Sequence, residues 1–436
     1  MNVVTRIAPS PTGQMHIGTV RTALFNYLWA KHKGGTFIVR VEDTDLARNR
    51  PEWTHMIWDD FAWCGLVPDK KFIQSENLPR HRELLQKLIT EDKAYVSKEP
   101  AKNNSSETVE VVRLRNAGSQ VTFDDQIRGS ITIDTTELGD FVIARSVGEP
   151  LYHFAVVVDD ADSGITHVMR GEDILSSTPR QILIQEALQF PRPIYVHLPL
   201  ILSKNGKKLS KRDHVVALED YRSRGFIAEG ILNYLALLGW NPGTNEEYFS
   251  LDQLIERFSL EGLQKSGAIF DDVKLLSVNQ HWLRKLSDQQ FAAHLDAEKP
   301  MDQGLIKLLR ERAQTFGEAR ELIVSGEFDF ASPNVSYDPA LLLAGAKTDA
   351  ASAAANLEHV AGLLRPLNQE DFASDAIKDA VFPYATQKGR SAVLWPLRVA
   401  LSGREKSPDP FAIAAIIGKE AALRRIDKAI KLLKPL

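Results

Sequence analysis

The chain of 436 residues is longer than one ordinary hydrophobic core, so several domains are expected, and its 44% hydrophobic and 25% charged residues exclude wholesale disorder. The only cysteine, Cys64, excludes an intramolecular disulfide and zinc sites of the usual Cys-rich spacing, and it favours a reducing, cytoplasmic location. The formal net charge of -4 excludes a uniformly basic surface, so residues that bind a nucleic acid must be gathered locally.

The first elements predict a parallel sheet. The N-terminus "MNVVTRIAPS" lacks the basic and apolar regions of an export signal, and no run of 18 apolar residues follows, so no membrane partner is expected. "VVTRIA" indicates a buried strand, and residues 18–32 indicate a helix because their apolar side chains share one face. "TFIVRV" at 36–41 indicates a second strand, which gives the strand, helix, strand unit typical of a nucleotide-binding fold.

Short alternating runs then predict an inserted, strand-rich module from about residue 75 to 151, including "VEVVRLR" and "GSITID". Within it, the polar composition of "SKEPAKNNSSET" at 97–108 predicts a mobile loop.

The alternation of strand and helix returns after the insertion. "ITHVMR" (165–170) and "IYVHLPLIL" (194–202) indicate strands, and the helix between them is expected to begin with Thr178 as N-cap and Pro179 at its first position. After about residue 215 the pattern is helical almost throughout, as in residues 230–240 and 251–263, and residues 325–339 indicate a loop. The predicted fold class is therefore α/β, a Rossmann-like parallel-sheet domain with a strand-rich insertion, followed by an all-α region.

A turn crowded with Pro, Gly and His precedes the first helix. Unpaired N–H groups and a partial positive charge at a helix N-terminus make a phosphate site, and residues 8–19 have this form. Pro9 and Pro11 stiffen the approach, whereas Gly13 and Gly18 leave room for a ligand on the backbone. His16 can donate to a phosphate oxygen there, although a single His more often has no special role.

A second cationic segment, "ILSKNGKKLSKRD" at 201–213, follows the last strand and carries Lys204, Lys207, Lys208, Lys211 and Arg212. A solvated charge run is the simpler interpretation. Its position favours a ligand site, because ligands of open α/β sheets bind beyond the carboxyl ends of the strands. The two segments are therefore expected to meet at one polyphosphate.

These segments carry a resemblance to a known family. His16-Ile17-Gly18-Thr19 resembles the HIGH signature, and the segment from Lys208 to Arg212, "KLSKR", resembles the KMSKS signature of class I aminoacyl-tRNA synthetases. "RIAPSPTG", "FIVRVEDTD" and "THVMRGEDIL" narrow the resemblance to glutamyl-tRNA synthetases, and it runs nearly end to end. The departures are Thr in place of the second His, and Leu and Arg within KMSKS.

The resemblance implies ATP-dependent ligation of L-glutamate to the 3′ end of tRNA(Glu) through glutamyl adenylate, with Mg²⁺ accompanying ATP. It implies a Rossmann-type catalytic domain at residues 1–75 and 152–202, an acceptor-end-binding module at 76–151, a helical stem-contact domain with the KMSKS-like loop at 203–287, and an all-helical anticodon-binding region at 288–436. No zinc is expected, because the Cys ligands that some members carry in the insertion are lacking. We expect a monomer.

The resemblance also implies the site residues. The catalytic residues are His16, Gly18, Lys208 and Lys211. Glutamate meets Glu42 with its ammonium group and Arg170 and Tyr152 with its γ-carboxylate, and the other contacts are Arg6, Ala8 and Ser10. ATP is bound by Thr12, His16, Gly18, Thr19, Asp173, Lys208, Ser210 and Lys211.

The tRNA contacts are also implied by the resemblance. "RLR" at 113–115 and "QIRG" at 126–129 match the acceptor-end module, and Arg312 falls where some members read the last anticodon base. Charging of tRNA(Gln) as well as tRNA(Glu) is left open. Two further alternatives are a truncated paralogue that glutamylates a tRNA base, which would lack the long C-terminal half found here, and a catalytically silent RNA-binding relative, which would not need His16 or Lys211.

The cationic loop generates the first prediction. Substitution Lys211→Ala removes a donor to the developing negative charge on the α-phosphate, so adenylate formation falls by a factor on the order of 10²–10³. The loss of tRNA affinity is much smaller. ATP/pyrophosphate exchange and tRNA binding, measured side by side, check both statements, and near-normal exchange contradicts the assignment.

Overall fold

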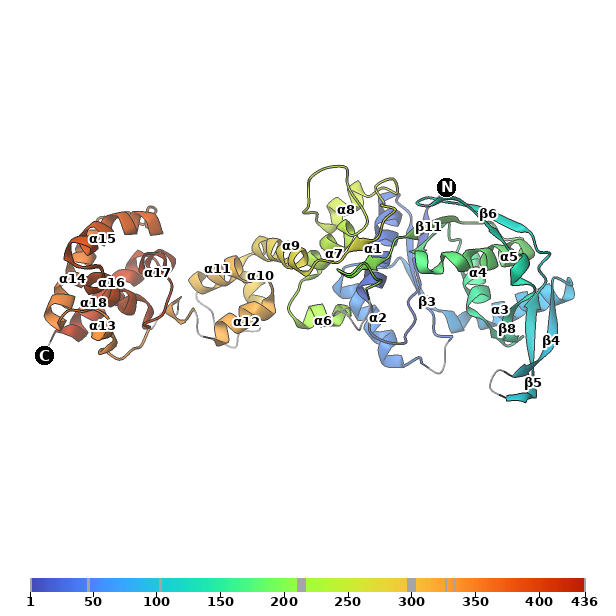
Figure 1. The fold of residues 1–436 in the computed structure, drawn as a ribbon, viewed down its shortest axis with the longest axis horizontal. Helices are drawn as coiled ribbons and strands as arrows, with labels where there is room; N and C mark the ends of the chain where they lie inside the picture. Colours follow the sequence, from blue (N-terminus) through green and yellow to red (C-terminus); the bar gives the residue numbers. More distant parts are fainter. Residues whose placement is uncertain are drawn as a thin grey trace. The chain divides into compact units, whose positions relative to one another are not determined.

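The computed structural model describes residues 2–44, 48–101, 104–209, 217–295, 303–325, 328–331 and 335–434. The chain forms two compact units, Met1–Asn279 and Gln280–Leu436 (Figure 1). Within the described ranges, no helix is long and apolar enough to cross a bilayer.

The first unit is built on a parallel sheet. Strands β1 (Val4–Ile7), β2 (Thr36–Val41) and β3 (Lys70–Ile73) pair in the order β1-β2-β3, and helices α1 (Ile17–His32) and α2 (Pro51–Trp63) connect them. On the other side of β1, the Thr166 amide donates to the Val4 carbonyl at 3.0 Å, which places β10 (His167–Gly171) beside it. Strand β11 (Ile194–Leu198) then pairs parallel with β10. The predicted α/β fold class is confirmed.

The insertion begins with α3 (Leu78–Thr90) and contains an antiparallel sheet of β4 (Ala94–Ala101), β5 (Asn104–Leu114), β8 (Phe141–Ser146) and β9 (Glu149–Pro150) (Figure 1). The prediction of a mobile loop at 97–108 is wrong for residues 97–101 and 104–108, which form the β4–β5 ladder, where Ser97 pairs with Val111 and Pro100 with Thr108; residues 102 and 103 lie outside the described residues. A ladder of backbone hydrogen bonds can carry polar side chains on its open face, and local composition does not reveal it.

The hairpin of β6 (Gln120–Asp125) and β7 (Gly129–Asp134) does not join the sheet of β4, β5, β8 and β9. Strand β6 pairs in parallel with β11, through Tyr195 and Asp125, so the hairpin extends the β10–β11 sheet. One part of the insertion therefore lies directly beside the strands that carry the predicted site residues.

Two boundaries differ from the sequence-based expectation. The 3-10 helix Glu172–Ser177 leads directly into α5 (Thr178–Leu188), so Ser177 is the N-cap and the prediction of Thr178 as N-cap is wrong. The Thr178 hydroxyl instead accepts a hydrogen bond from Arg170. The strand expected at 194–202 is broken into β11 and β12 (Ile201–Leu202), and β12 pairs with β13 (Ala268–Ile269).

The remaining elements of the first unit are helical. They are α4 (Tyr152–Asp162), the 3-10 helices Gln74–Asn77 and Thr136–Leu138, α6 (Leu218–Ser223), α7 (Ala228–Leu237), α8 (Leu251–Arg257) and α9 (Asp272–Lys285), whose last residues belong to the second unit. Helix α8 ends well before residue 263, so the helix predicted at 251–263 is too long.

The second unit is helical, as predicted. Its helices are α10 (Asp288–Ala293), α11 (Gln303–Arg312), α12 (Phe316–Val324), α13 (Leu341–Ala344), α14 (Ala350–Leu364), α15 (Ser374–Lys388), α16 (Arg390–Ser402), α17 (Pro410–Ile417) and α18 (Lys419–Leu433). Helices α14, α16 and α18 pack on one another and bury their apolar faces. The loop expected at 325–339 contains the 3-10 helix Asp329–Ala331, and part of it lies outside the described residues.

Two adjacent glycines between α1 and β2 generate a prediction about stability. Gly34 has φ +60 and open space around an added Cβ, whereas a Cβ on Gly35 would lie 2.0 Å from the Val3 carbonyl oxygen. Substitution G34A therefore only places an Ala in the left-handed backbone conformation, which lowers the free energy of unfolding by about 1 kcal/mol. Substitution G35A must also push apart the start of β1 and β2, so we expect a loss of about 3 kcal/mol. Urea unfolding followed by circular dichroism checks the order, and equal losses contradict it.

Candidate active site

A cavity of about 450 Å³ opens where β1, β2, β10 and β11 end, which is where ligands of open α/β sheets bind. This volume lies within the range of small-molecule sites. The cavity is lined by the residues Arg6, Ile7, Ala8, Pro9, Ser10, His16, Gly18, Thr19, Arg21, Thr22, Glu42, Tyr152, Met169, Arg170, Gly171, Asp173, Ile174, Leu200, Ile201, Lys208 and Leu209.

Most of the predicted site residues meet in this cavity. Its lining includes the whole predicted glutamate set (Arg6, Ala8, Ser10, Glu42, Tyr152 and Arg170) and, from the predicted catalytic and ATP sets, His16, Gly18, Thr19, Asp173 and Lys208. Thr12 does not line it, and Ser210 and Lys211 lie outside the described residues. Arg312 is the last residue of α11 in the second unit, where it is exposed.

The turn before α1 fixes the orientation of His16. His16 is the N-cap, and its Nδ1 accepts a hydrogen bond of 2.9 Å from the Gly18 amide. In a neutral ring the proton is then on Nε2, which becomes the donor. A Cβ on residue 18 would lie 3.1 Å from His16 Nδ1, closer than an ordinary contact, so glycine leaves room for the imidazole.

The structure describes the two ends of the lysine-rich loop. One end lines the cavity, and the other contacts the turn before α1. At the first end, the Leu209 amide donates to the Ile201 carbonyl at 2.9 Å, which closes a tight hairpin that carries Lys208. At the other end, Ala217 forms a β-bridge with His16. Lys208 Nζ contacts Asp173 Oδ2 at 2.6 Å, so a cation and an anion stand together at the mouth of the cavity. The His16 turn and the described part of the lysine-rich segment therefore lie at the same cavity.

A buried ionic network supports the opposite end of the cavity. Arg40, 1% exposed, donates from one Nη to Asp160 at 2.7 Å and from the other to Glu42 at 3.1 Å. Arg6 binds the same Asp160 with its Nε and one Nη, both at 3.1 Å. Burial alone would lower the pKa of Arg40, but the three carboxylates of Asp160, Glu42 and Asp159 raise it overall.

The carboxylates of this network differ in the direction in which their pKa values are shifted. Burial would raise the pKa of Asp160, but Arg6 and Arg40 hold it below its usual range. Burial raises the pKa of Glu42, and Arg40 offsets this only in part. A cationic group bound beside Glu42 would lower that pKa again, so this carboxylate is suited to an ammonium ion.

Arg170 has a different environment. It is 5% exposed and donates to three neutral acceptors, His197 Nε2 at 3.1 Å, Gln181 Oε1 at 2.7 Å and Thr178 Oγ1 at 2.8 Å. Among the described residues no carboxylate forms an ion pair with it. Burial lowers the pKa of Arg170, and the nearby Arg6 adds to this. A bound carboxylate would relieve both effects.

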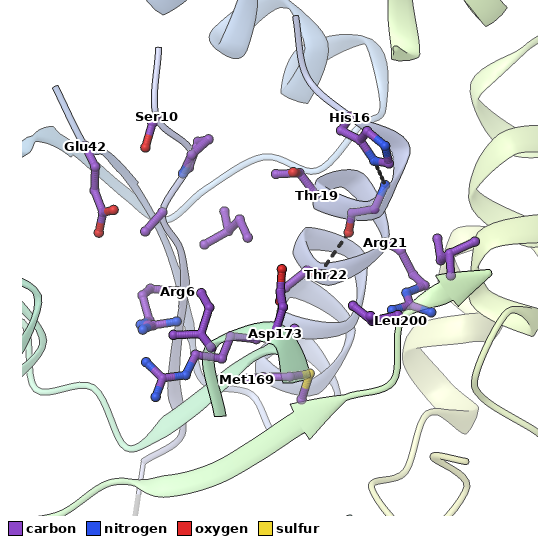
Figure 2. A pocket seen from close by; sticks show the side chains of 18 of the residues that line it. Arg6, Ser10, His16, Thr19, Arg21, Thr22, Glu42, Met169, Asp173 and Leu200 are labelled. Carbon is purple, nitrogen blue, oxygen red and sulfur yellow. Dashed lines mark hydrogen bonds between the residues drawn. The ribbon is translucent and has the colours of Figure 1, made fainter. Parts of the chain in front are cut away.

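Sequence reasoning missed Arg21. It lies on α1, lines the cavity and is 3% exposed, and it donates to the carbonyls of Leu238, at 3.0 Å, and Pro199. Its Nε is buried and has no hydrogen-bond partner among the described residues, and burial lowers its pKa to about 10. The signal in the sequence is a single Arg within the apolar run that follows His16. Figure 2 shows His16 and Arg21 on one side of the cavity, with Arg6 and Glu42 on the other.

In the described part of the chain, no group of three His, Cys, Asp or Glu side chains is arranged so that it could hold a metal ion. Asp173, the exposed carboxylate of the lining, is already paired with Lys208.

A parallel α/β sheet whose carboxyl edge carries a His-capped helix and a lysine-bearing hairpin defines a nucleotide-binding domain of the class I aminoacyl-tRNA synthetase type. Comparisons with known proteins agree. The family described as "tRNA synthetases class I (E and Q), catalytic domain" matches residues 2–105 and 97–277, and "Anticodon binding domain" matches residues 268–430. The chain belongs to this family of class I tRNA synthetases.

Full-length relatives give the same result. The chain is 36% identical to glutamate–tRNA ligase 1 of Alkalilimnicola ehrlichii, covering 98% of both chains, and 36% identical to glutamate–tRNA ligase of Geobacter sulfurreducens, covering 99% of both. A crystal structure of a glutamate tRNA ligase from Elizabethkingia meningosepticum, in complex with its amino acid, is 30% identical with a TM-score of 0.79 over 100% of both chains. A second, from Elizabethkingia anophelis, is 30% identical with a TM-score of 0.78, covering 99% of this chain and 100% of that one.

The ionic network generates the next prediction. Substitution R40M leaves buried carboxylates without their cation, so we expect it to lower the free energy of unfolding by about 3–5 kcal/mol. Arg80 provides a matched control, because it also pairs with two carboxylates, Glu83 and Asp162, but at the surface. Substitution R80M should cost less than about 0.5 kcal/mol. Urea unfolding of both variants tests this, and a cost for R40M no larger than that for R80M contradicts it.

Proposed function

We propose that this chain ligates L-glutamate to the 3′ end of tRNA(Glu) at the expense of ATP, with glutamyl adenylate as the intermediate. The observation that carries the proposal is a single cavity that joins the His16 turn and the Lys208 hairpin to Glu42 and Arg170. Relatives that match the chain over nearly its whole length are named glutamate–tRNA ligases, in keeping with this activity.

The side of the cavity that holds His16 and Arg21 receives ATP. An oxygen of the glutamate α-carboxylate attacks the α-phosphate, pyrophosphate leaves, and negative charge grows on the phosphoryl oxygens. His16 Nε2–H and the ammonium groups of Lys211 and Lys208 are donors for that charge, and the hydrogen bond from the Gly18 amide orients the imidazole before the reaction. The other ATP contacts are Thr12, Gly18, Thr19, Asp173 and Ser210. Mg²⁺ binds with ATP, mainly through its phosphates.

The opposite side receives glutamate. Glu42 binds the ammonium group, and Arg170 binds the γ-carboxylate with Tyr152, while Arg6, Ala8 and Ser10 complete the site. Asp160 forms an ion pair with Arg6, but no described carboxylate forms one with Arg170. A guanidinium without a carboxylate partner favours a γ-carboxylate over an amide, because the NH₂ group of the amide would face N–H donors.

In the second step, a ribose hydroxyl of the terminal adenosine attacks the glutamyl carbonyl and AMP leaves. Residues 1–75 and 152–202 form the catalytic domain, 76–151 bind the acceptor end, 203–287 contact the stem, and 288–436 bind the anticodon with Arg312. The match of residues 268–430 to an anticodon-binding domain supports the last assignment. The enzyme is a cytoplasmic monomer without zinc.

The activity is tested by offering purified protein with ATP and labelled glutamate to tRNA(Glu) and tRNA(Gln) in separate reactions. Labelled tRNA(Glu) and glutamate-dependent ATP/pyrophosphate exchange in the presence of tRNA are the expected results. Absence of both overturns the proposal. If tRNA(Gln) is labelled as well, the enzyme charges both tRNAs and not tRNA(Glu) alone.

The role of Arg170 gives a separate prediction. Substitution R170L removes the cation that pairs with the γ-carboxylate, so kcat/KM for glutamate falls by at least about 10³-fold, while ATP still binds. R192L is the control, because Arg192 is an exposed residue paired with Glu186 outside the cavity. Glutamate kinetics and equilibrium dialysis with ATP provide the measurement. An R170L enzyme with an unchanged KM for glutamate refutes the assignment.

A further inference from the structure

The orientation of Arg170 depends on a residue behind it. His197 lies on β11 and is fully buried, and its Nε2 is 3.1 Å from Arg170 Nε and 3.2 Å from the Thr178 hydroxyl. Its Nδ1 lies 2.7 Å from Asp125 Oδ2, which also accepts from the His197 backbone amide at 3.0 Å. Asp125 is the last residue of β6, so the chain of contacts starts in the inserted hairpin.

The chemistry of these contacts fixes the state of the ring. Arg170 Nε can only donate, so His197 Nε2 must accept, and the ring proton must be on Nδ1, where it is donated to Asp125. Asp125 is itself held in place, because its other oxygen accepts from the amides of Ile127 and Arg128 at 3.0 and 2.9 Å. The imidazole therefore stands between a fixed carboxylate and a fixed guanidinium.

We propose that His197, held by Asp125, is a positioning residue for glutamate selection that orients Arg170 without neutralising it. This inference rests on the proposed role of Arg170 in binding the γ-carboxylate. A carboxylate in direct contact with Arg170 would compensate its charge, as Asp160 does for Arg6. The imidazole separates Asp125 from Arg170, so the guanidinium gains a hydrogen-bond acceptor and its positive charge stays available to the substrate.

The surroundings keep His197 neutral. Burial lowers its pKa and the charges of Arg170 and Arg128 add to this, whereas Asp125 opposes it. The ring of Tyr195 from β11 and that of Phe123 from β6 lie 6.1 and 6.4 Å away, so no further charged group faces the imidazole from those strands. From α5 the facing group is the Thr178 hydroxyl. Protonation at low pH would place a second donor against Arg170 Nε.

Two amide substitutions separate the two contacts of the ring. In H197N the amide reaches the place of Nδ1, so it can still donate to Asp125, but Arg170 Nε loses its acceptor. In H197Q the longer side chain reaches the place of Nε2, and its carbonyl oxygen can accept from Arg170. We expect H197N to raise the KM for glutamate by about 10-fold, with kcat and the KM for ATP changed less than about 2-fold. H197Q should stay within about 3-fold of the unsubstituted enzyme.

Two further readouts exclude a purely structural role. The ratio of kcat/KM for glutamate to that for glutamine should fall in H197N and be restored in H197Q. The KM for glutamate should rise more steeply on the acid side in the unsubstituted enzyme than in H197Q, because Glu42 gains a proton in both enzymes and His197 only in the first. If H197N does not fold, as judged by thermal unfolding, D125N serves in its place, because it keeps the shape of the side chain and weakens the hold on His197.

The outcomes distinguish this inference from the proposed function. If R170L leaves the KM for glutamate unchanged, the role of Arg170 fails and the inference fails with it. If R170L abolishes glutamate use but H197N and D125N leave both the KM and the glutamate/glutamine ratio unchanged, only the positioning role is overturned. Equal losses in H197N and H197Q, with equal effects on glutamate and ATP, also overturn it, because they indicate general damage to the core.

Discussion

The buried contact between Arg40 and Asp160 is the interaction on which the site depends. Arg40 on β2 binds Asp160 on α4, and Asp160 in turn binds Arg6 on β1, so one carboxylate fixes two neighbouring strands. Glu42 directly follows the last residue of that strand and is held by Arg40. Buried ions are costly unless they are fully paired, so the network admits few alternative arrangements of these side chains. It thereby sets the positions of the side chains at the proposed glutamate end before any ligand arrives.

The sequence predicted the elements whose signals are local. The strand expected at 36–41 has the observed bounds, because an apolar run begins directly after the glycines that end α1. The strand boundaries at β4, β5 and β11 were missed for a physical reason. A β-ladder is stabilised by partners far along the chain, so the polar composition of 97–108 says little about whether those residues pair. The N-cap of α5 was misplaced because the preceding 3-10 helix, and the use of Thr178 by Arg170, are tertiary features.

The site was predictable as a set of residues, but its electrostatics were not. Arg6 and Arg170 both stand at strand ends and look alike in the sequence. They differ because Asp160, 154 residues beyond Arg6 in the chain, forms an ion pair with Arg6 but acts on Arg170 only from a distance. Likewise, nothing local marks His197 as a partner of Arg170. Motif spacing identifies which residues gather, whereas the distribution of charge among them emerges only from the packed structure.

The β6–β7 hairpin connects the proposed glutamate end of the cavity to a segment that resembles the acceptor-end module. Residues 126–128 form its turn, and two contacts lead from this turn to the cavity. Asp125 reaches Arg170 through His197, and Arg128 forms an ion pair with Glu172, which also accepts from the Leu200 amide at 3.0 Å. Because β6 pairs directly with β11, the turn cannot shift without disturbing these contacts. The edge of the sheet thus holds the turn and Arg170, the proposed selector of glutamate, in one frame.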